Sequence, residues 1–236
     1  MKMKNKKAEQ IEKKEKHREA RKAAKKRRRG EPVLDRPEPK KPVKPSILIV
    51  CEGKNTEPSY FRQFRLSSAT IKVVGEGCNT ISLVNRAAEI IQQDDYDQVW
   101  CVFDKDDFPE EDFNNAIAIA EAQGMSVAYS NQAFEYWIIL HFEDHQGGPM
   151  HRSDYVDKLN SYLSQWGEHY DKDSKVISEG IFGILEGIDP KFALVRRSLA
   201  IRRAKRIYDQ FDHRSPAREE SSTKVYSLVE EILKYL

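Results

Sequence analysis

The chain has 236 residues, of which 39% are hydrophobic and 33% are charged, and its net charge is +2. It contains no apolar run near the roughly 18 residues that a membrane-spanning helix needs, and its charged N-terminus lacks the apolar stretch of a signal peptide. Its three cysteines are too few and too scattered for a disulfide framework. We therefore expect a cytoplasmic protein that does not associate with membranes.

The charge is distributed unevenly along the chain. Residues 1–45 contain 19 Lys+Arg and 7 Asp+Glu, whereas residues 46–236 contain 21 and 31, so a basic arm precedes an acidic body. Such an arm suits nucleic acid or another polyanion. Residues 1–30 have no apolar stripe to bury, which predicts a disordered arm or a lone solvated helix. The proline-rich stretch that follows, up to Pro45, predicts an extended linker.

From Ser46 onward, strand-like apolar runs alternate with helix-like segments. The predicted strands are 46–51, 70–75, 98–104 and 125–130, and the predicted helices between and after them are 56–66, 80–93, 109–123 and 133–141. This alternation predicts an α/β fold over residues 46–150, with a mainly parallel sheet and helices on both faces. In the first helix, Thr56 is a candidate N-cap.

The remainder of the chain is predicted to be helical. We expect helices at 151–165, 178–187, 190–211 and 221–235, and hence a helical C-terminal extension over residues 151–236 that packs on the α/β core. The helix predicted at 190–211 carries a stripe of basic residues. This stripe indicates either a nucleic-acid contact through Arg196, Arg197 and Arg203, or the solvated face of an amphipathic helix.

Acidic residues follow two of the predicted strands. Glu52 ends the first strand, and Asp104 ends the third, with Asp106 two positions later. Working groups in open α/β sheets lie beyond the carboxyl ends of the strands. If the two strands are neighbours, these carboxylates share one edge and suit Mg²⁺ or Mn²⁺. Taken singly, each motif is also typical of an ordinary acidic turn.

Three sequence blocks carry a resemblance to a known family. The stretches LIVCEGKNTEPSYF, VWCVFDKDDF and SNQAFEYWIILHF are similar to the signature blocks of the RloB-like family. Its members are Toprim-type proteins found in bacterial anti-phage defence and abortive-infection loci, often beside an ATPase. The resemblance implies a Toprim-like fold for residues 46–150. It departs at Gln132 and Ala133, where the family usually has proline and cysteine.

The resemblance also implies roles for individual residues. Glu52 matches the Toprim glutamate, a metal ligand or general acid/base, and Asp104 and Asp106 match the Asp-x-Asp metal pair. Glu135 matches the family's acidic residue after the fourth strand, although a carboxylate at a helix start is an equally good explanation of it. Lys54 is a candidate phosphate contact. Glu57 is interpreted first as a helix-start carboxylate and second as a site residue.

Together, these observations predict a metal-dependent nuclease. It would cleave phosphodiesters in DNA or RNA, with tRNA as one candidate, and would act in anti-phage defence with an ATPase partner. The catalytic residues would be Glu52, Asp104, Asp106 and Glu135. The main alternative is a non-catalytic module that binds nucleic acid or a partner on a Toprim scaffold. The sequence leaves the oligomeric state open.

Overall fold

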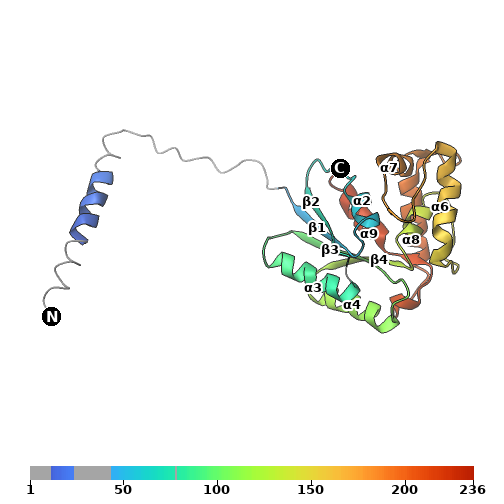
Figure 1. Cartoon of the computed structure of the whole chain (residues 1–236), viewed down its shortest axis with the longest axis horizontal. Coiled ribbons are helices and arrows are strands. Elements are labelled where there is room, and N and C mark those ends of the chain that lie inside the picture. The colour runs from blue at the N-terminus through green and yellow to red at the C-terminus, as the bar shows by residue number, and fades with distance from the viewer. Residues whose placement is uncertain (1–11, 24–43, 78) are drawn as a thin grey trace. The chain divides into compact units, whose positions relative to one another are not determined.

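The computed structural model describes residues 12–23, 44–77 and 79–236 (Figure 1). The chain divides into two compact units, Met1–Val43 and Lys44–Leu236. In the first unit, residues 12–23 form a helix in which every residue is exposed, as expected of a solvated helix without an apolar stripe. The remainder of the predicted arm and linker, up to residue 43, lies outside the described residues.

The second unit is built on a five-stranded sheet. Its strands are β1 (Ser46–Cys51), β2 (Thr70–Gly75), β3 (Gln98–Asp104), β4 (Ser126–Asn131) and β7 (Ser222–Thr223), in the order β2-β1-β3-β4-β7. The first four strands pair in parallel, and only β7 is antiparallel, against β4. The prediction of an α/β fold with a mainly parallel sheet is therefore confirmed.

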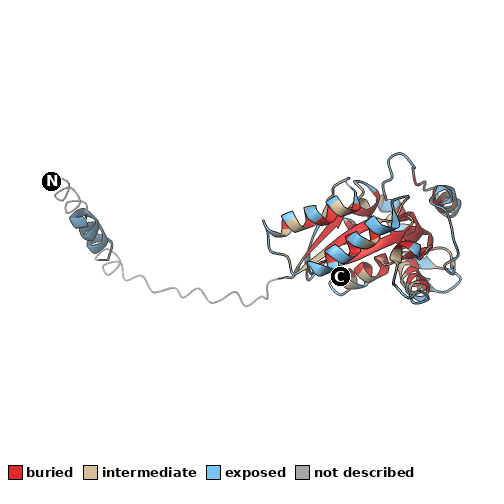
Figure 2. Cartoon of the chain, turned by 90° about the horizontal axis from the view of Figure 1, so that it is seen from below, coloured by how far each residue is buried: buried red, intermediate tan, exposed pale blue. Residues whose placement is uncertain are grey.

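Helices cover both faces of the sheet because the central strands are apolar on both sides. In β1, Ile47 and Ile49 belong to one buried cluster, whereas Leu48 and Val50 belong to the other. The first face is covered by α2 (Thr56–Phe61), α5 (Glu135–Ile139) and α9 (Val225–Leu233), and the second by α3 (Thr80–Ile91) and α4 (Glu110–Ala122). Figure 2 shows the buried strands between helices whose outer sides are exposed.

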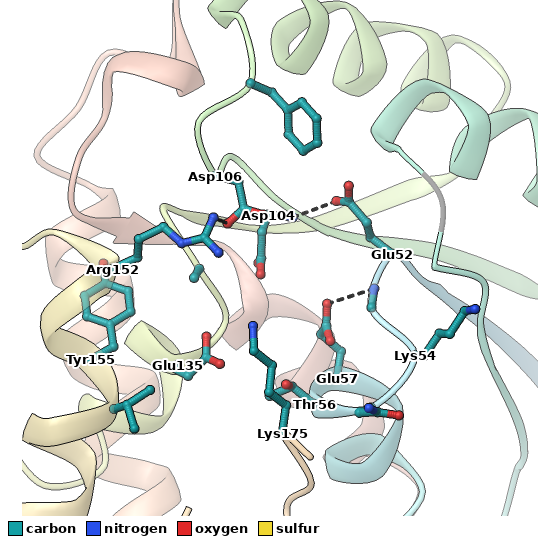
Figure 3. Close-up of a pocket in the computed structure, with 15 residues that line it drawn as sticks. Glu52, Lys54, Thr56, Glu57, Asp104, Asp106, Glu135, Arg152, Tyr155 and Lys175 are labelled. Atoms are coloured by element: carbon teal, nitrogen blue, oxygen red, sulfur yellow. Dashed lines mark hydrogen bonds and ion pairs between the residues drawn. The ribbon is translucent and has the colours of Figure 1, made fainter. Parts of the chain in front are cut away.

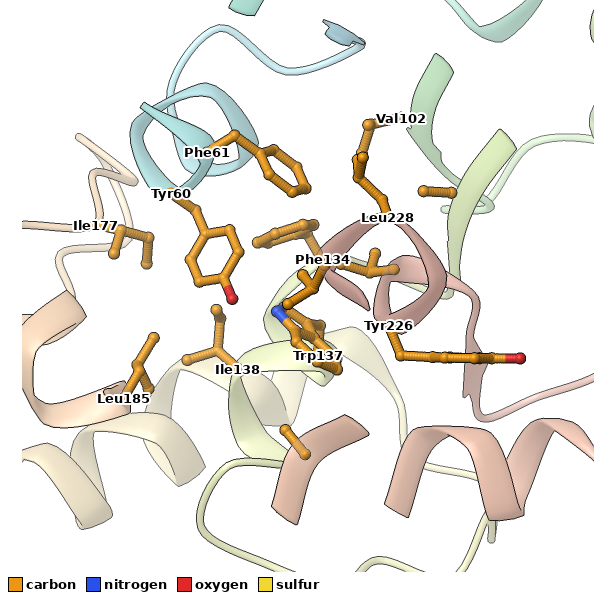
Figure 4. Close-up of a cluster of buried hydrophobic side chains, with 14 of the residues drawn as sticks. Tyr60, Phe61, Val102, Phe134, Trp137, Ile138, Ile177, Leu185, Tyr226 and Leu228 are labelled. Carbon is orange, nitrogen blue, oxygen red and sulfur yellow. The ribbon is translucent and has the colours of Figure 1, made fainter. Parts of the chain in front are cut away.

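The predicted extension packs into the first of these clusters. It contributes α6 (Tyr155–Leu163), α7 (Glu179–Leu185), α8 (Arg196–Tyr208) and α9. Around α5, the ring of Phe134 makes edge contacts with Tyr60 and Phe61 of α2, and Leu228 of α9 lies in the same cluster (Figure 4). Within the described ranges, no helix combines the length and the apolar character that crossing a membrane requires.

Some element boundaries were predicted wrongly. The helix expected at 190–211 begins only at Arg196, because residues 188–195 form a small antiparallel hairpin of β5 (Ile188–Asp189) and β6 (Leu194–Val195). The Asp189 side chain accepts hydrogen bonds from the N–H groups of Lys191 and Phe192, which stabilises the turn. Likewise, β7 occupies the start of the helix expected at 221–235, and α2 ends at Phe61 rather than at residue 66.

The topology creates a crevice at one edge of the sheet. The chain leaves β1 through α2 on one face and leaves β3 through α4 on the opposite face. Because β1 and β3 are neighbours, the two connections diverge between them. A ligand crevice forms at such a switch point, outside the carboxyl ends of the strands.

Candidate functional site

A cavity of about 260 Å³ lies at this switch point (Figure 3). Its wall includes the loop between β1 and α2, the end of β3, the start of α5, and two segments of the C-terminal extension. The charged residues that line it are Glu52, Lys54, Glu57, Asp104, Asp106, Glu135, Arg152 and Lys175. The four carboxylates predicted from sequence are therefore gathered in one cavity, together with Glu57.

Glu52 and Asp104 lie on adjacent strand ends. The N–H of Glu52 donates to the carbonyl of Val102 at 2.9 Å, which continues the pairing of β1 with β3. One carboxylate oxygen of Glu52 then accepts the N–H of Asp104 at 3.2 Å. Asp104 itself accepts the N–H of Phe134 through Oδ2 at 3.0 Å. Its other oxygen, Oδ1, is buried and has no hydrogen-bond partner among the described residues.

Asp106 reaches the cavity through a left-handed backbone conformation. Its φ is +43°, which aspartate tolerates better than most residues, and its N–H donates to the carbonyl of Gln132 at 2.9 Å. Its carboxylate forms an ion pair with Arg152, which precedes α6. A cation from the extension is thus already paired with one of the predicted metal ligands.

Glu135 and Thr56 are joined through a buried tyrosine. Tyr170 donates its hydroxyl to Glu135 at 2.7 Å and lies 3.0 Å from the hydroxyl of Thr56. Since the single tyrosine proton goes to Glu135, the Thr56 hydroxyl must donate to Tyr170. The prediction of Thr56 as an N-cap is wrong, because Asn55 occupies that position and Thr56 is the first residue of α2.

Glu57 turns back into the cavity instead of facing solvent. Its carboxylate accepts the N–H of Gly53 at 3.2 Å, and the residue is only 4% exposed. A side chain at position 53 would collide with this carboxylate, so the glycine makes room for it. Glu57 lies in the first turn of α2, as interpreted from sequence, and it also lines the cavity.

Burial and mutual repulsion perturb these carboxyls. Burial, the largest effect, raises the pKa of Glu52 to about 7, although the hydrogen bond from Asp104 opposes it. Burial also raises the pKa of Glu57 to about 7, and it raises the pKa of Asp104 well above its usual range with the help of Glu57. The pKa of Asp106 is raised by burial, and Arg152 opposes this rise. Shifts of this kind are typical of functional sites.

The donor set suits a hard divalent cation that keeps part of its water shell. Among the residues that the structure describes, no three His, Cys, Asp or Glu side chains are placed to hold an ion by themselves. Mg²⁺, however, usually binds through one or two carboxylates, with waters and substrate phosphate as further ligands. Among the described residues, five carboxylates and three cations line the cavity, an excess of two formal negative charges. Asp104 Oδ1, which has no hydrogen-bond partner among those residues, is an available ligand.

Lys54 lines the cavity, but its side chain points away from the carboxylates (Figure 3). Its aliphatic part lies against the backbone of Gly77, where a side chain would collide with it. The phosphate contact predicted for Lys54 would therefore be made at the rim of the cavity.

The three arginines predicted to contact nucleic acid are not on a free surface. Arg196 and Arg203 are 6% and 7% exposed. Arg203 donates to the carbonyl of Leu140 at 2.8 Å, and Arg196 donates to the carbonyl of Ile184 at 3.0 Å. These contacts do not agree with a nucleic-acid role, because the guanidinium groups of both residues stabilise the packing of α8.

Arg197 is likewise occupied, since it forms an ion pair with Glu186. The exposed basic residues of α8 are instead Arg202, Lys205 and Arg206, and Arg206 pairs with Asp144. None of the basic residues of α8 lines the cavity.

Three residues of the site were missed from sequence: Arg152, Tyr170 and Lys175. All three belong to the segment that was predicted only as a helical extension. They are single residues in polar stretches without a motif, and folding brings them to the strand ends through contacts with residues more than 40 positions away. Only tertiary structure could have identified them.

The comparisons with known proteins agree with the sequence blocks. The family model described as RloB-like protein matches residues 47–232. No curated protein and no solved structure gives a match. The matched segment covers most of the chain and contains the whole site. The chain therefore belongs to the RloB-like family.

Proposed function

We propose that this protein is a nuclease of Toprim type that hydrolyses phosphodiesters with the help of Mg²⁺ or Mn²⁺. The observation that carries the proposal is the meeting of Glu52, Asp104 and Asp106 at the switch point of the sheet. There, one buried Asp104 oxygen has no hydrogen-bond partner in the described part of the chain. Membership of the RloB-like family supports the same function.

The residues of the cavity can divide the work as follows. One or two of the carboxylates of Glu52, Asp104 and Asp106, together with waters, would hold the ion, which when bound would neutralise charge on the phosphate and favour ionisation of a bound water. In the metal-free cavity, burial raises the pKa of Glu52 to about 7. Glu52 can therefore exchange a proton at neutral pH where it is not itself a ligand of the ion. The buried Glu135 is oriented by its hydrogen bond from Tyr170.

The wider setting is also a proposal. Action on DNA or RNA, including tRNA, in anti-phage defence with an ATPase partner is supported by the resemblance of the three sequence blocks to the family. The basic arm, with its net charge of +12 over residues 1–45, supports contact with a polyanion.

One observation favours a non-catalytic alternative. Arg152 pairs with Asp106 and so competes with a metal ion for that carboxylate. If this pair persisted in the working protein, the cavity would bind nucleic acid or a partner without cleaving it.

A cleavage assay separates the two functions. Wild-type protein, Glu52→Gln and Asp104→Asn would be incubated with labelled DNA or RNA in Mg²⁺ or Mn²⁺, alone and with any ATPase encoded beside its gene. We expect both variants to lose at least about 100-fold in rate. The matched control is Glu111→Gln, an exposed carboxylate of α4 outside the cavity. Equal cleavage by all four proteins would refute the site, and binding without cleavage would favour the alternative.

A further inference from the structure

The segment 170–177, here called the site loop, lies between α6 and α7 in the chain. Hydrogen bonds fix its first residue, Tyr170. The backbone of Tyr170 exchanges two hydrogen bonds with the Asn160 side chain, of 2.7 and 3.0 Å. The Tyr170 hydroxyl contacts Thr56 and Glu135, and the residue is fully buried. One end of the site loop is therefore fixed both to α6 and to the cavity wall.

The other end of the site loop is fixed to α2. The N–H of Ile177 donates to the Ser59 hydroxyl at 2.8 Å, and the Gln63 side chain donates to the Ile177 carbonyl at 3.3 Å. Ile177 is fully buried in the core cluster. Because both ends are anchored, the residues between them have a defined position relative to β1 and α2.

A tight turn within the site loop presents Lys175 to the cavity. The Asp171 carboxylate accepts the N–H groups of Asp173 and Ser174, and the Asp171 carbonyl accepts the N–H of Lys175 at 2.8 Å. Lys175 has a φ of +52°. Its side chain extends into the cavity between Glu57 and Glu135 (Figure 3).

Lys175 is close to the carboxylates but is not committed to any of them. It lines the same cavity as Glu57, Asp106 and Glu135. Yet, among the described residues, no carboxylate oxygen lies within 4.0 Å of its ammonium group, whereas the guanidinium group of Arg152 forms an ion pair with Asp106. An exposed lysine in this position can give its hydrogen bonds to a bound anion.

We propose that Lys175 binds a non-bridging oxygen of the scissile phosphate in a nucleic-acid backbone, and that the site loop is the platform that holds it there. A lysine ammonium is a compact point charge that suits a phosphate oxygen. This inference rests on the proposed function, because it assigns a substrate contact within the same cavity.

The test compares salt dependence of binding in full-length protein. Lys175→Met, Lys175→Arg and the control Lys172→Met would each be made in a Glu52→Gln background, which keeps the probe uncleaved. Lys172 is exposed in the same loop but does not line the cavity. The probes are fluorescent single-stranded DNA and RNA oligonucleotides, and Kd is measured at several KCl concentrations. The basic arm is identical in all variants, so its contribution to Kd and to the salt slope cancels when the variants are compared.

For Lys175→Met we expect weaker binding and a loss of about 0.7 from the slope of log affinity against log salt, which corresponds to one phosphate contact. Lys175→Arg should keep the slope, and Lys172→Met should match the background protein. Equal slopes for the two methionine variants would overturn the inference, even if the wild-type protein cleaves. A selective loss for Lys175→Met without any wild-type cleavage would instead overturn the proposed function, and would show that Lys175 contacts a phosphate that is bound but not cleaved.

Discussion

Glu57 shows how a single residue can belong both to a helix start and to a cavity. Its position after Thr56 is typical of a carboxylate that stabilises a helix start. In the structure, the same position also lets its carboxylate accept the N–H of Gly53 and line the cavity. The sequence could not show this, because the direction of the side chain depends on how the loop between β1 and α2 turns.

Glu57→Gln is expected to stabilise the protein at high pH only. The pKa of Glu57 is raised to about 7 from 4.5, so the folded protein retains a proton that the unfolded chain releases. Below about pH 4.5 the carboxyl is protonated in both states, so its ionisation does not change the unfolding free energy. Between about pH 4.5 and pH 7 it lowers the unfolding free energy by a growing amount, and above about pH 7 this loss stays constant. Glutamine keeps the oxygen that accepts the N–H of Gly53. We expect a gain of ~1–3 kcal/mol in unfolding free energy at pH 8, measured by urea denaturation, and none at pH 4. An equal gain at both pH values would contradict this explanation.

A divalent cation should stabilise the folded protein in a pH-dependent manner. Protons and metal ions compete for the same carboxylates, so Mn²⁺ should raise the Tm more at pH 8 than at pH 5. Asp104→Asn removes a negatively charged ligand from the cavity and should abolish the rise in Tm caused by Mn²⁺. The control Glu111→Gln should retain this rise. Thermal denaturation with and without Mn²⁺ measures both effects. A shift that survives in Asp104→Asn would place the ion elsewhere.

Tyr170→Phe is expected to weaken both the fold and the site. The change removes one hydroxyl, and so leaves Glu135 and Thr56 without their buried partner. The unfolding free energy should fall by about 1–3 kcal/mol. Any cleavage should fall further than the loss of folded protein explains, as measured by rate per folded molecule. Tyr235→Phe, a tyrosine outside the cavity, serves as the control.

At the scale of elements, helix α8 illustrates a limit of reading periodicity. Its basic residues suggest a solvated face, but Arg196 and Arg203 belong to the buried face together with Leu199 and Ala200. Arg203 satisfies the carbonyl of Leu140 at the end of α5, where helices leave carbonyl groups without partners. The sequence alone does not distinguish an arginine that donates to the last carbonyl groups of another helix from an arginine that faces water.

Arg203→Met should therefore lower the unfolding free energy through the lost contact with Leu140, and not through a lost contact with nucleic acid. Leaving the Leu140 carbonyl unsatisfied is expected to cost about 1–3 kcal/mol. The neighbouring Arg202 is exposed, and Arg202→Met should change the unfolding free energy by less than about 0.5 kcal/mol. Denaturant titration of both variants measures the difference. If the two substitutions have equal effects, the contact with Leu140 contributes nothing to stability.

The long elements of the sheet were predictable, and the short ones were not. Strands β1, β2 and β3 have the predicted bounds, and β4 is shifted by one residue, because continuous apolar runs between helices are typical of buried parallel strands. The strands β5, β6 and β7 have two residues each, too few for any periodic pattern. Glu52 and Asp104 could be placed together because parallel strands end at the same edge, whereas Arg152 and Lys175 depend on how the extension packs.

At the scale of the whole molecule, the body from residue 44 onward is expected to be independent of the arm. Residues 44–236 form a compact unit of their own. A chain lacking residues 1–43 should keep the Tm of the full chain while binding oligonucleotides more weakly and with a smaller salt slope, since most of the basic arm is gone. Calorimetry and fluorescence titration test the two parts separately. A lower Tm would show that the arm supports the fold.

The order of the site residues along the chain has a consequence for biosynthesis. Every carboxylate of the cavity lies before residue 136, whereas Arg152 and Lys175 come later, from the extension that also supplies β7 and α9. During translation, the acidic residues therefore emerge from the ribosome well before Arg152 and Lys175, and before the strand and helices that complete the core. The cavity is therefore completed late in translation, so an unfinished nascent chain does not yet carry the whole candidate site.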